Sequence, residues 1–169
     1  MKRVFLSLGS NLGDRVAHLQ RTIDRLSASG LAVQRVSALY RTEPVDFQAQ
    51  SWFVNCVVEV ATDLMPMQLL KTLKGLERAL GRRPGVSKGP RAIDIDILLY
   101  ENVFVRSAAL TIPHARLSER RFVLAPLRDL EPHLRHPLTQ RSVIEMLAET
   151  ADKSQILRLK EELRIGNSE

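Results

Sequence analysis

The chain has 169 residues, of which 44% are hydrophobic and 26% are charged, the size and composition of one ordinary globular domain. Its 25 basic and 19 acidic residues give a formal net charge of +6, which favours polyanionic partners without choosing among nucleotides, nucleic acids and anionic membranes. A single cysteine, Cys56, excludes an intramolecular disulfide, and no apolar stretch approaches the roughly 18 residues of a membrane-spanning helix. We therefore expect a cytoplasmic protein.

The regular patterns fall in the order strand, helix, strand, strand, helix, strand. In chain order, the predicted elements are a strand over residues 4–8, a helix over 16–26, strands over 33–40 and 52–60, a helix over 66–80 and a strand over 93–100. Asn11 or Asp14 can cap the first helix, and Pro66 opens the second where proline is tolerated. The apolar stripe of the second helix comprises Met67, Leu70, Leu73, Leu76 and Leu80.

This order predicts an α+β fold, namely a ferredoxin-like βαββαβ core with an antiparallel sheet and helices packed on one face. Beyond residue 114 the pattern becomes mostly helical, including residues 142–149, which predicts a mostly helical C-terminal extension. Residues 151–169 form a charged tail, for which a loose helix and a frayed end are both open. We expect one domain over residues 1–150, followed by this tail.

An aspartate pair interrupts the apolar run of the last predicted strand. Side chains alternate between the faces of a strand, so the isoleucines of this run point into a core while Asp94 and Asp96 share the other face. Their Cα atoms would lie about 6.5–7 Å apart, a spacing at which carboxylates repel each other unless a cation offsets their charge. Such hard oxygen ligands suit Mg²⁺, which keeps water and substrate phosphates as further ligands. The alternative reading is an amphipathic strand with a solvated acidic face.

A basic loop leads into this strand. Residues 78–91 carry five basic side chains and no acidic one, with two prolines and three glycines that break regular structure. Arginine forms planar, bidentate hydrogen bonds with phosphate oxygens, so such a loop is suited to close over a polyphosphate. A solvated run of charge is the alternative. Together, the loop and the aspartate pair indicate Mg²⁺ with a nucleoside triphosphate.

Six motifs in this order carry a resemblance to a known family. They are Leu8-Gly9-Ser10-Asn11-Leu12-Gly13, Tyr40-Arg41-Thr42, Phe53-Val54-Asn55, Gly89-Pro90-Arg91 through Asp94-Ile95-Asp96, Ile112-Pro113-His114 and Glu119-Arg120-Arg121-Phe122-Val123-Leu124. As a set they closely resemble 6-hydroxymethyl-7,8-dihydropterin pyrophosphokinase, an enzyme family of folate biosynthesis. The resemblance spans residues 4 to about 147. Any one motif alone is weak, whereas the combination is highly specific.

The resemblance implies the transfer of an intact diphosphate from ATP to the hydroxymethyl oxygen of the pterin, with release of AMP. It implies two Mg²⁺ ions held by Asp94 and Asp96, with ATP as co-substrate. Arg82 and Arg91 resemble catalytic arginines that close on the triphosphate. The further ATP contacts that it implies are Thr111, His114 and Arg120.

The pterin pocket that the resemblance implies places aromatic rings on both faces of the substrate. Its residues are Thr42, Pro44, Val45, Phe53 and Asn55, with Phe122 on the opposite face. Without the family, Phe53 and Phe122 are ordinary core residues, and His114 after a proline is structural or exposed. Asn55 in an apolar strand is less ordinary, since a buried amide needs partners.

The sequence departs from the family pattern at a few positions. Lys88 stands where the family often carries a tryptophan, Ala109 where an arginine is frequent, and Glu43 where some members have proline. The loop between Arg82 and Arg91 is slightly shortened. None of these positions is one of the two aspartates.

Three other functions compete with a monomeric, Mg²⁺-dependent pyrophosphokinase that has only small-molecule partners. An RNA-binding module is one, but the chain has only eight Phe, Trp and Tyr residues and no RNP-like motif. A kinase that transfers one phosphoryl group is another, although the phosphate-loop and protein-kinase motifs are missing from the sequence. A non-catalytic protein that binds a pterin is the third, against which the arginines and aspartates argue.

Overall fold

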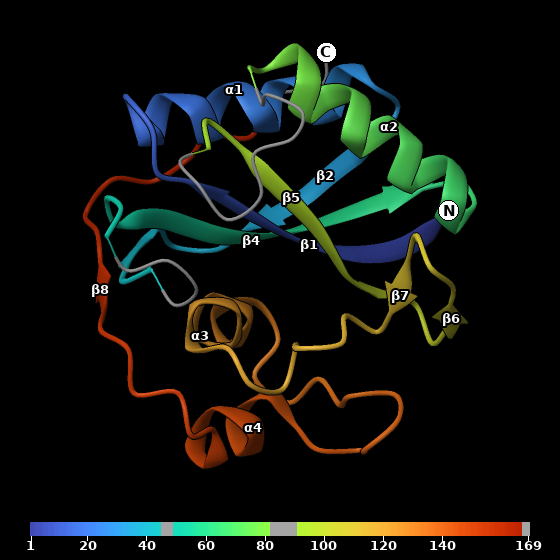
Figure 1. The fold of residues 1–169 in the computed structure, drawn as a ribbon. Coiled ribbons are helices and arrows are strands. Elements are labelled where there is room, and N and C mark those ends of the chain that lie inside the picture. The colour runs from blue at the N-terminus through green and yellow to red at the C-terminus, as the bar shows by residue number, and fades with distance from the viewer. Residues whose placement is uncertain (45–48, 82–90, 167–169) are drawn as a thin grey trace.

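The computed structural model describes residues 1–44, 49–81 and 91–166 as a mixed α/β fold with four helices and an antiparallel main sheet (Figure 1). In chain order, its elements are β1 (Lys2–Ser10), α1 (Arg15–Ala28), β2 (Ala32–Val36), β3 (Tyr40–Thr42), β4 (Phe53–Thr62), α2 (Pro66–Ala79), β5 (Asp94–Tyr100), β6 (Val105–Arg106), β7 (Thr111–Ile112), α3 (Arg121–Leu130), α4 (Val143–Glu149) and β8 (Ile156–Arg158).

The main sheet places β1 between β4 and β5. Its strand order is β5-β1-β4-β3-β8, and β2 also pairs with β4. In this register Gly9 of β1 lies opposite Asn55 on β4 and opposite Asp94 on β5. The sheet therefore brings residues from widely separated parts of the sequence to the two sides of one central strand.

Helices cover both faces of the sheet (Figure 1). Val4, Leu6 and Leu8 of β1 pack in the cluster beneath α1 and α2, whereas Phe5 packs in the cluster beneath α3 and α4. The two helices of the predicted core, α1 and α2, lie on one face as expected, and α3, from the predicted C-terminal extension, covers the other. Because both faces are covered, β1 is buried from Val4 to Ser10. The strand extends beyond the predicted residues 4–8 at both ends.

The predicted strand over residues 33–40 is divided in the structure into β2 and β3. Both pair with β4, and Ser37 lies between them. The amide of Val57 donates to the Ser37 hydroxyl (2.9 Å), and the Ser37 amide donates to the Val57 carbonyl (2.9 Å). A side-chain oxygen thus replaces a backbone acceptor, which interrupts the ladder without leaving the Val57 amide unpaired.

The first two helices begin and end within two residues of the predicted bounds. Asp14 caps α1 by accepting from the amide of Ala17 (3.1 Å), and Pro66 occupies the first turn of α2. Gly81, with φ of +104°, follows the end of α2 in the left-handed region that favours glycine. The predicted stripe of α2 is correct at Leu73 and Leu76, but Leu69 is buried, whereas Met67 is exposed.

The C-terminal tail adds a strand to the sheet. Neither the loose helix nor the frayed end is present over residues 156–158, because β8 pairs with the edge strand β3. The Glu43 amide donates to the Gln155 carbonyl (3.1 Å), and the Gln155 amide donates to the Glu43 carboxylate (3.1 Å). The tail therefore covers a sheet edge that would otherwise expose unpaired backbone groups.

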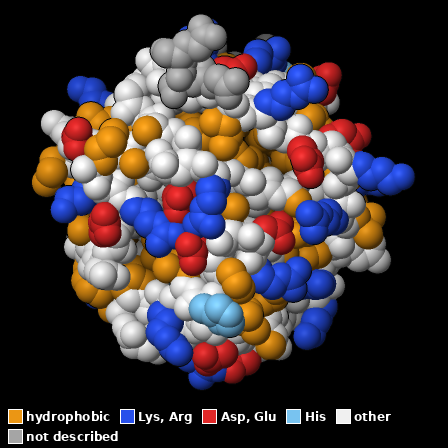
Figure 2. Space-filling model, turned by 180° about the vertical axis from the view of Figure 1, so that it is seen from behind, with side chains coloured by type: hydrophobic (Ala, Val, Ile, Leu, Met, Phe, Trp, Pro, Cys, Tyr) orange, Lys and Arg blue, Asp and Glu red, His pale blue; other side chains and the backbone are white. Residues whose placement is uncertain are grey.

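The surface mixes charges of both signs. Figure 2 shows the molecule from behind, where Lys and Arg side chains lie interspersed with Asp and Glu. Within the described ranges, no helix is long and apolar enough to cross a membrane.

Candidate active site

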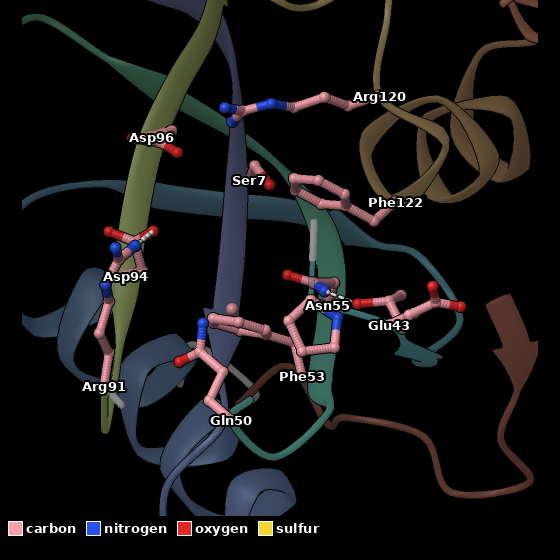
Figure 3. Close-up of a pocket in the computed structure, with 13 residues that line it drawn as sticks. Ser7, Glu43, Gln50, Phe53, Asn55, Arg91, Asp94, Asp96, Arg120 and Phe122 are labelled. Carbon is pink, nitrogen blue, oxygen red and sulfur yellow. Dashed lines mark hydrogen bonds and ion pairs between the residues drawn. The ribbon is translucent and has the colours of Figure 1, made fainter. Parts of the chain in front are cut away.

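A pocket lies on the sheet face that α3 covers, and its lining comes from strands β1, β3, β4 and β5 and from the start of α3 (Figure 3). One end is charged and holds Asp94, Asp96, Arg91 and Arg120. The other end holds aromatic rings and amides. The pocket thus has two chemically distinct ends on one continuous floor.

The charged end is built by the alternation of β5. Ile95 and Ile97 are buried in the core on one face, as predicted, and Asp94 and Asp96 line the pocket on the other. Burial, together with the neighbouring charge of Asp94, raises the pKa of Asp96 to about 6. Two carboxylates are thus held together where solvent cannot fully stabilise their charge.

Arg91 stands beside this pair. Its guanidinium Nη1 donates to Asp94 Oδ2 at 2.9 Å, and both side chains are largely buried. Arg120, the residue before α3, reaches over the pocket from the opposite side, and its guanidinium carbon lies 5.4 Å from the centre of the Phe122 ring (Figure 3). Two arginines therefore approach the aspartates from different elements.

A buried glutamate holds the aspartate strand from behind. Glu77 of α2 is 2% exposed, and its carboxylate accepts a hydrogen bond from the amide of Ile95 (2.9 Å), the residue between the two aspartates. Lys74 Nζ lies 3.6 Å from the same carboxylate. No sequence pattern indicates this role, because Glu77 resembles any charged residue of an amphipathic helix.

The other end of the pocket combines two phenylalanines with a fixed amide. Phe53 and Phe122 project into the pocket from β4 and α3 (Figure 3). Asn55 Nδ2 donates to Thr42 Oγ1 at 2.5 Å, so the orientation of the amide is set by the neighbouring strand. A Cβ on Gly9 would lie only 2.5 Å from Asn55 Oδ1, so only glycine leaves room for the amide there. The buried amide thus has the partner that the sequence argument required.

Asn11 connects the chain segments on either side of the pocket. Its Oδ1 accepts from the amide of Arg91 (2.6 Å), and its Nδ2 donates to Gln50 Oε1 (2.7 Å) and to the Ser51 carbonyl (3.3 Å). Asn11 is 3% exposed and does not cap α1, a role that belongs to Asp14. Asn11 thus links the segment that leads into β5 to the segment that leads into β4.

The pocket brings together most of the predicted site residues that the structure describes. Thr111 and His114 are not in the lining: Thr111 is exposed on β7, and His114 follows that strand. Burial, and then the charge of Arg120, lower the pKa of His114, whose Nδ1 accepts from the Arg116 amide (3.1 Å). Val45 and Arg82, predicted for the pterin and the triphosphate, lie outside the described residues, as does Lys88. The predicted residues in the lining are Thr42, Pro44, Phe53, Asn55, Arg91, Asp94, Asp96, Arg120 and Phe122.

Four lining residues were not predicted as site residues. They are Ser7, Gly9, Glu43 and Gln50. A serine within an apolar strand and a glutamine within a polar loop carry no recognisable signal. The Gly-Ser-Asn motif marked Gly9 and Asn11, but taken alone it reads as a turn.

The carboxylates fit a hard divalent cation. Among the described residues, no group of three or more His, Cys, Asp or Glu side chains is placed to hold a metal ion. Asp94 and Asp96 would therefore supply two protein ligands and leave the remaining positions to water and phosphate oxygens. This is the ligand set that Mg²⁺ prefers, and a cation would also offset the repulsion that raises the pKa of Asp96.

Comparison with known sequences gives one family. The model of "7,8-dihydro-6-hydroxymethylpterin-pyrophosphokinase (HPPK)" matches residues 5–132. A "2-amino-4-hydroxy-6-hydroxymethyldihydropteridine pyrophosphokinase" of Aquifex aeolicus is 37% identical over 153 residues, which cover 90% of this chain and 95% of that protein. A protein of the same name from Methylorubrum extorquens is 44% identical over 135 residues, or 79% of this chain and 85% of that one.

Some relatives are much longer than this chain. The "Folic acid synthesis protein fol1" of Pneumocystis carinii is 42% identical over 149 residues, which cover 88% of this chain but only 20% of that protein. Among solved structures, the "HPPK-DHPS wild type with Pteroate" of Plasmodium falciparum has a TM-score of 0.72 at 15% identity, covering 88% of this chain and 44% of that chain. This likeness concerns the fold alone.

Proposed function

Since the chain belongs to the 7,8-dihydro-6-hydroxymethylpterin-pyrophosphokinase family, we propose that it transfers an intact diphosphate from ATP to 6-hydroxymethyl-7,8-dihydropterin in folate biosynthesis. The observation that carries this proposal is the pairing of two functions in one pocket. The aspartate pair lies at one end, and an aromatic and amide slot lies at the other. Such a pocket suits a flat heterocycle whose reactive arm must reach a metal-bound polyphosphate.

The reaction forms one bond and breaks one. The hydroxymethyl oxygen attacks the β-phosphorus of ATP, and the bond from that phosphorus to the oxygen bridging the α- and β-phosphorus breaks. AMP leaves with the bridging oxygen, and the proton of the attacking hydroxyl is released to solvent. The products are therefore AMP and the pterin diphosphate, whereas a kinase that transfers one phosphoryl group gives ADP.

Asp94 and Asp96 hold the metal in this proposal. We assign two Mg²⁺ ions to them, which the pair of carboxylates and their mutual repulsion support. Bound Mg²⁺ supplies positive charge that offsets the phosphate oxygens and the charge developing on the leaving AMP. Glu77 keeps the strand in place through Ile95, so that both carboxylates stay directed at the phosphates.

Arginines bind the triphosphate. Arg91 already lies beside Asp94, where it can bind phosphate oxygens next to the metal ligands, and Arg120 approaches from the start of α3. Neutral His114, whose Nδ1 accepts from the Arg116 amide, keeps its Nε2 proton as a donor for phosphate. Thr111 and Arg82 complete the proposed ATP contacts.

The pterin occupies the slot between Phe53 and Phe122. Stacking on aromatic rings contributes about 0.5–1.5 kcal/mol per pair beyond the burial of area. Thr42 holds the Asn55 amide so that its oxygen is available to the donors of the pyrimidinone edge. Pro44, which follows β3, belongs to the lining of the slot, and we also assign Val45 to the pterin.

The same proposal extends to the architecture. The strand order β5-β1-β4-β2, with α1 and α2 on one face, supports a ferredoxin-like core, and α3 and α4 support a mostly helical extension. We assign the catalytic domain to residues 1–150 and treat residues 151–169 as a tail, of which β8 pairs with the sheet edge. We also propose a cytoplasmic monomer that has small molecules as its only partners.

The direct test is to incubate the protein with ATP, Mg²⁺ and 6-hydroxymethyl-7,8-dihydropterin and to follow the nucleotides by phosphorus NMR. We expect AMP to appear in step with a pterin diphosphate. ADP would indicate transfer of a single phosphoryl group, and pterin binding without turnover would indicate a non-catalytic relative. Either of these outcomes would overturn the proposal.

A further inference from the structure

We propose that Ser7 contacts the substrate and selects for the hydroxyl group on its hydroxymethyl arm, an inference that rests on the function proposed above. Ser7 lies in the middle of β1, and its side chain belongs to the floor of the pocket (Figure 3). The sequence did not point to this residue. Its position in the sheet assigns it the role.

Ser7 lies between the two ends of the pocket. It is opposite Asp96 on β5 and opposite Val57 on β4, and Gly9, two residues further along the same face, is opposite Asn55. Neighbouring strands are about 4.8 Å apart, so β4 and β5 are separated by about 9.6 Å across β1. A bicyclic pterin that meets Asn55 with its pyrimidinone edge and Asp96 with its arm has to cross this floor.

The height of the floor changes along β1. Gly9 has no side chain, and the Asn55 amide occupies the space where one would lie, so the ring of the substrate meets Asn55 there and not a side chain of β1. The next side chain of β1 on the same face is the Ser7 hydroxymethyl group. The Ser7 side chain therefore contacts the hydroxymethyl arm of the substrate rather than its ring.

The Ser7 hydroxyl is available for this contact. Ser7 is 5% exposed, and its side chain lines the pocket, where a bound substrate can reach its hydroxyl. Buried polar groups are normally hydrogen-bonded, because losing water without gaining a partner is costly. When the substrate fills the pocket and displaces water, the Ser7 hydroxyl is therefore expected to bind a polar atom of the ligand.

The chemistry of a hydroxyl suits the reacting group. A serine oxygen can accept the hydrogen bond of the substrate O–H, which leaves the lone pairs of the attacking oxygen directed at the phosphorus. Ser7 would thereby fix the rotation of the arm beside Asp96 without taking part in bond making. Orientation of this kind contributes to the rate because the reacting atoms start in line.

The test combines a change in the protein with a change in the ligand. We would measure the binding of 6-hydroxymethyl-7,8-dihydropterin and of 6-methyl-7,8-dihydropterin, which lacks the hydroxyl, to the wild type and to Ser7→Ala by calorimetry. The wild type should prefer the hydroxymethyl compound by about 5- to 10-fold, the worth of one neutral hydrogen bond. Ser7→Ala should bind both compounds with nearly equal affinity, and its kcat should fall as well.

Ser10→Ala is the matched control. Ser10 is on the same strand, is fully buried on the opposite face and has a hydroxyl without a partner among the described residues. This variant should keep the preference of the wild type. Ser7→Thr, which retains a hydroxyl, should also keep it.

The outcomes separate this inference from the proposed function. If the wild type binds both pterins but Ser7→Ala keeps the full preference for the hydroxymethyl compound, Ser7 is part of the packing and the inference is wrong. A loss of preference in Ser10→Ala as well would likewise overturn it, because the effect would then not depend on the pocket face. If the wild type binds neither pterin, the proposed function fails and this inference fails with it.

Discussion

Two pairs of carboxylates lie on the same face of the sheet. Arginines surround one pair, whereas in the other pair the two negative charges repel each other. Glu59 on β4 and Glu131 after α3 share Arg3 and Arg35 through four contacts of 2.5–3.0 Å. In the other pair, Asp94 and Asp96, burial and the charge of Asp94 raise the pKa of Asp96 to about 6. Burial alone would raise the pKa of Glu59, but the hydrogen bonds from Arg35 and Arg3 hold it below the ordinary value.

The comparison shows how a fold separates structural charge from functional charge. The glutamate pair receives two cations from the protein itself and fastens the end of α3 to the sheet, with Arg35 also donating to the Leu130 carbonyl (2.8 Å). In the aspartate pair, the two carboxylates repel each other, and the surrounding protein does not fully offset this repulsion. Negative charge that is retained at the cost of stability is typical of a site that binds a cation.

Removing one aspartate should have the largest effect. We expect Asp96→Asn to lower kcat by at least about 10²–10³-fold at saturating Mg²⁺, because the metal loses a ligand where charge develops in the transition state. The same variant, without metal, should unfold at a higher denaturant concentration than the wild type at pH 7–8, because a buried like-charge repulsion is removed. Steady-state kinetics and urea unfolding measure the two effects. Turnover close to that of the wild type would contradict the metal assignment.

Replacing Arg91 tests the positive charge that partly offsets the charge of the aspartates. Arg91→Ala should lower kcat by about 10²-fold while changing the KM for ATP much less, as expected for a contact that strengthens in the transition state. Arg91→Lys should recover only part of the rate, because an ammonium cannot form the bidentate contact. An increase confined to KM would show that Arg91 binds the ground state only.

A change in the glutamate pair should lower the stability of the protein but leave kcat nearly unchanged. Glu59→Gln removes a carboxylate that accepts from Arg3 Nε (2.6 Å) and Arg35 Nη2 (3.0 Å). Because both arginines are about two-fifths exposed, water screens the loss, and we expect a decrease of about 1–2 kcal/mol in the free energy of unfolding. The kcat should stay within about twofold of the wild type. A decrease in kcat as large as that of Asp96→Asn would remove the distinction between the two pairs.

The two pairs should also give opposite pH dependence of stability. The pKa of Asp96 is raised in the folded state. The protonated carboxyl therefore stabilises the fold fully below pH 3.8, and this stabilisation is lost as the pH rises through about 6. The pKa values of Glu59 and Glu131 are lowered, so their contribution is present above pH 4.5 and is lost as the pH falls below it.

Urea unfolding of the metal-free protein between pH 3 and pH 8 checks this prediction. The stability of the wild type should pass through a maximum near pH 5, and Asp96→Asn should lack the decline above it, a difference on the order of 1–3 kcal/mol. Glu59→Gln should keep that decline and show a weaker loss on the acid side. Identical profiles for all three proteins would contradict the assigned pKa directions.

The sequence alone predicted the framework and the charged end of the site because these follow from local patterns. Alternation placed Asp94 and Asp96 on one face, helical spacing and punctuation located α1 and α2, and the motif set indicated Phe53, Asn55 and Phe122. What it missed depends on contacts between distant segments. The division of β2 from β3 rests on the Ser37 side chain. The pairing of β8 rests on an open sheet edge that is distant in the sequence, since Arg158 lies opposite Tyr40.

The same limit explains the missed site residues. Asn11 acts through Arg91 and Gln50, Glu77 through Ile95, and Ser7 through its place opposite Asp96. Each has an ordinary side chain in an ordinary local pattern. Its role exists only once the sheet register has been formed.

The most direct test of the central claim is calorimetric titration of Mg²⁺ with a non-hydrolysable ATP analogue into three proteins: the wild type, Asp96→Asn and Glu59→Gln. If the aspartate pair is the metal site and the glutamate pair is structural, the wild type and Glu59→Gln should bind the complex with similar affinity. Asp96→Asn should bind it at least about tenfold more weakly. Equal binding by all three proteins, or a loss in Glu59→Gln alone, would contradict the account.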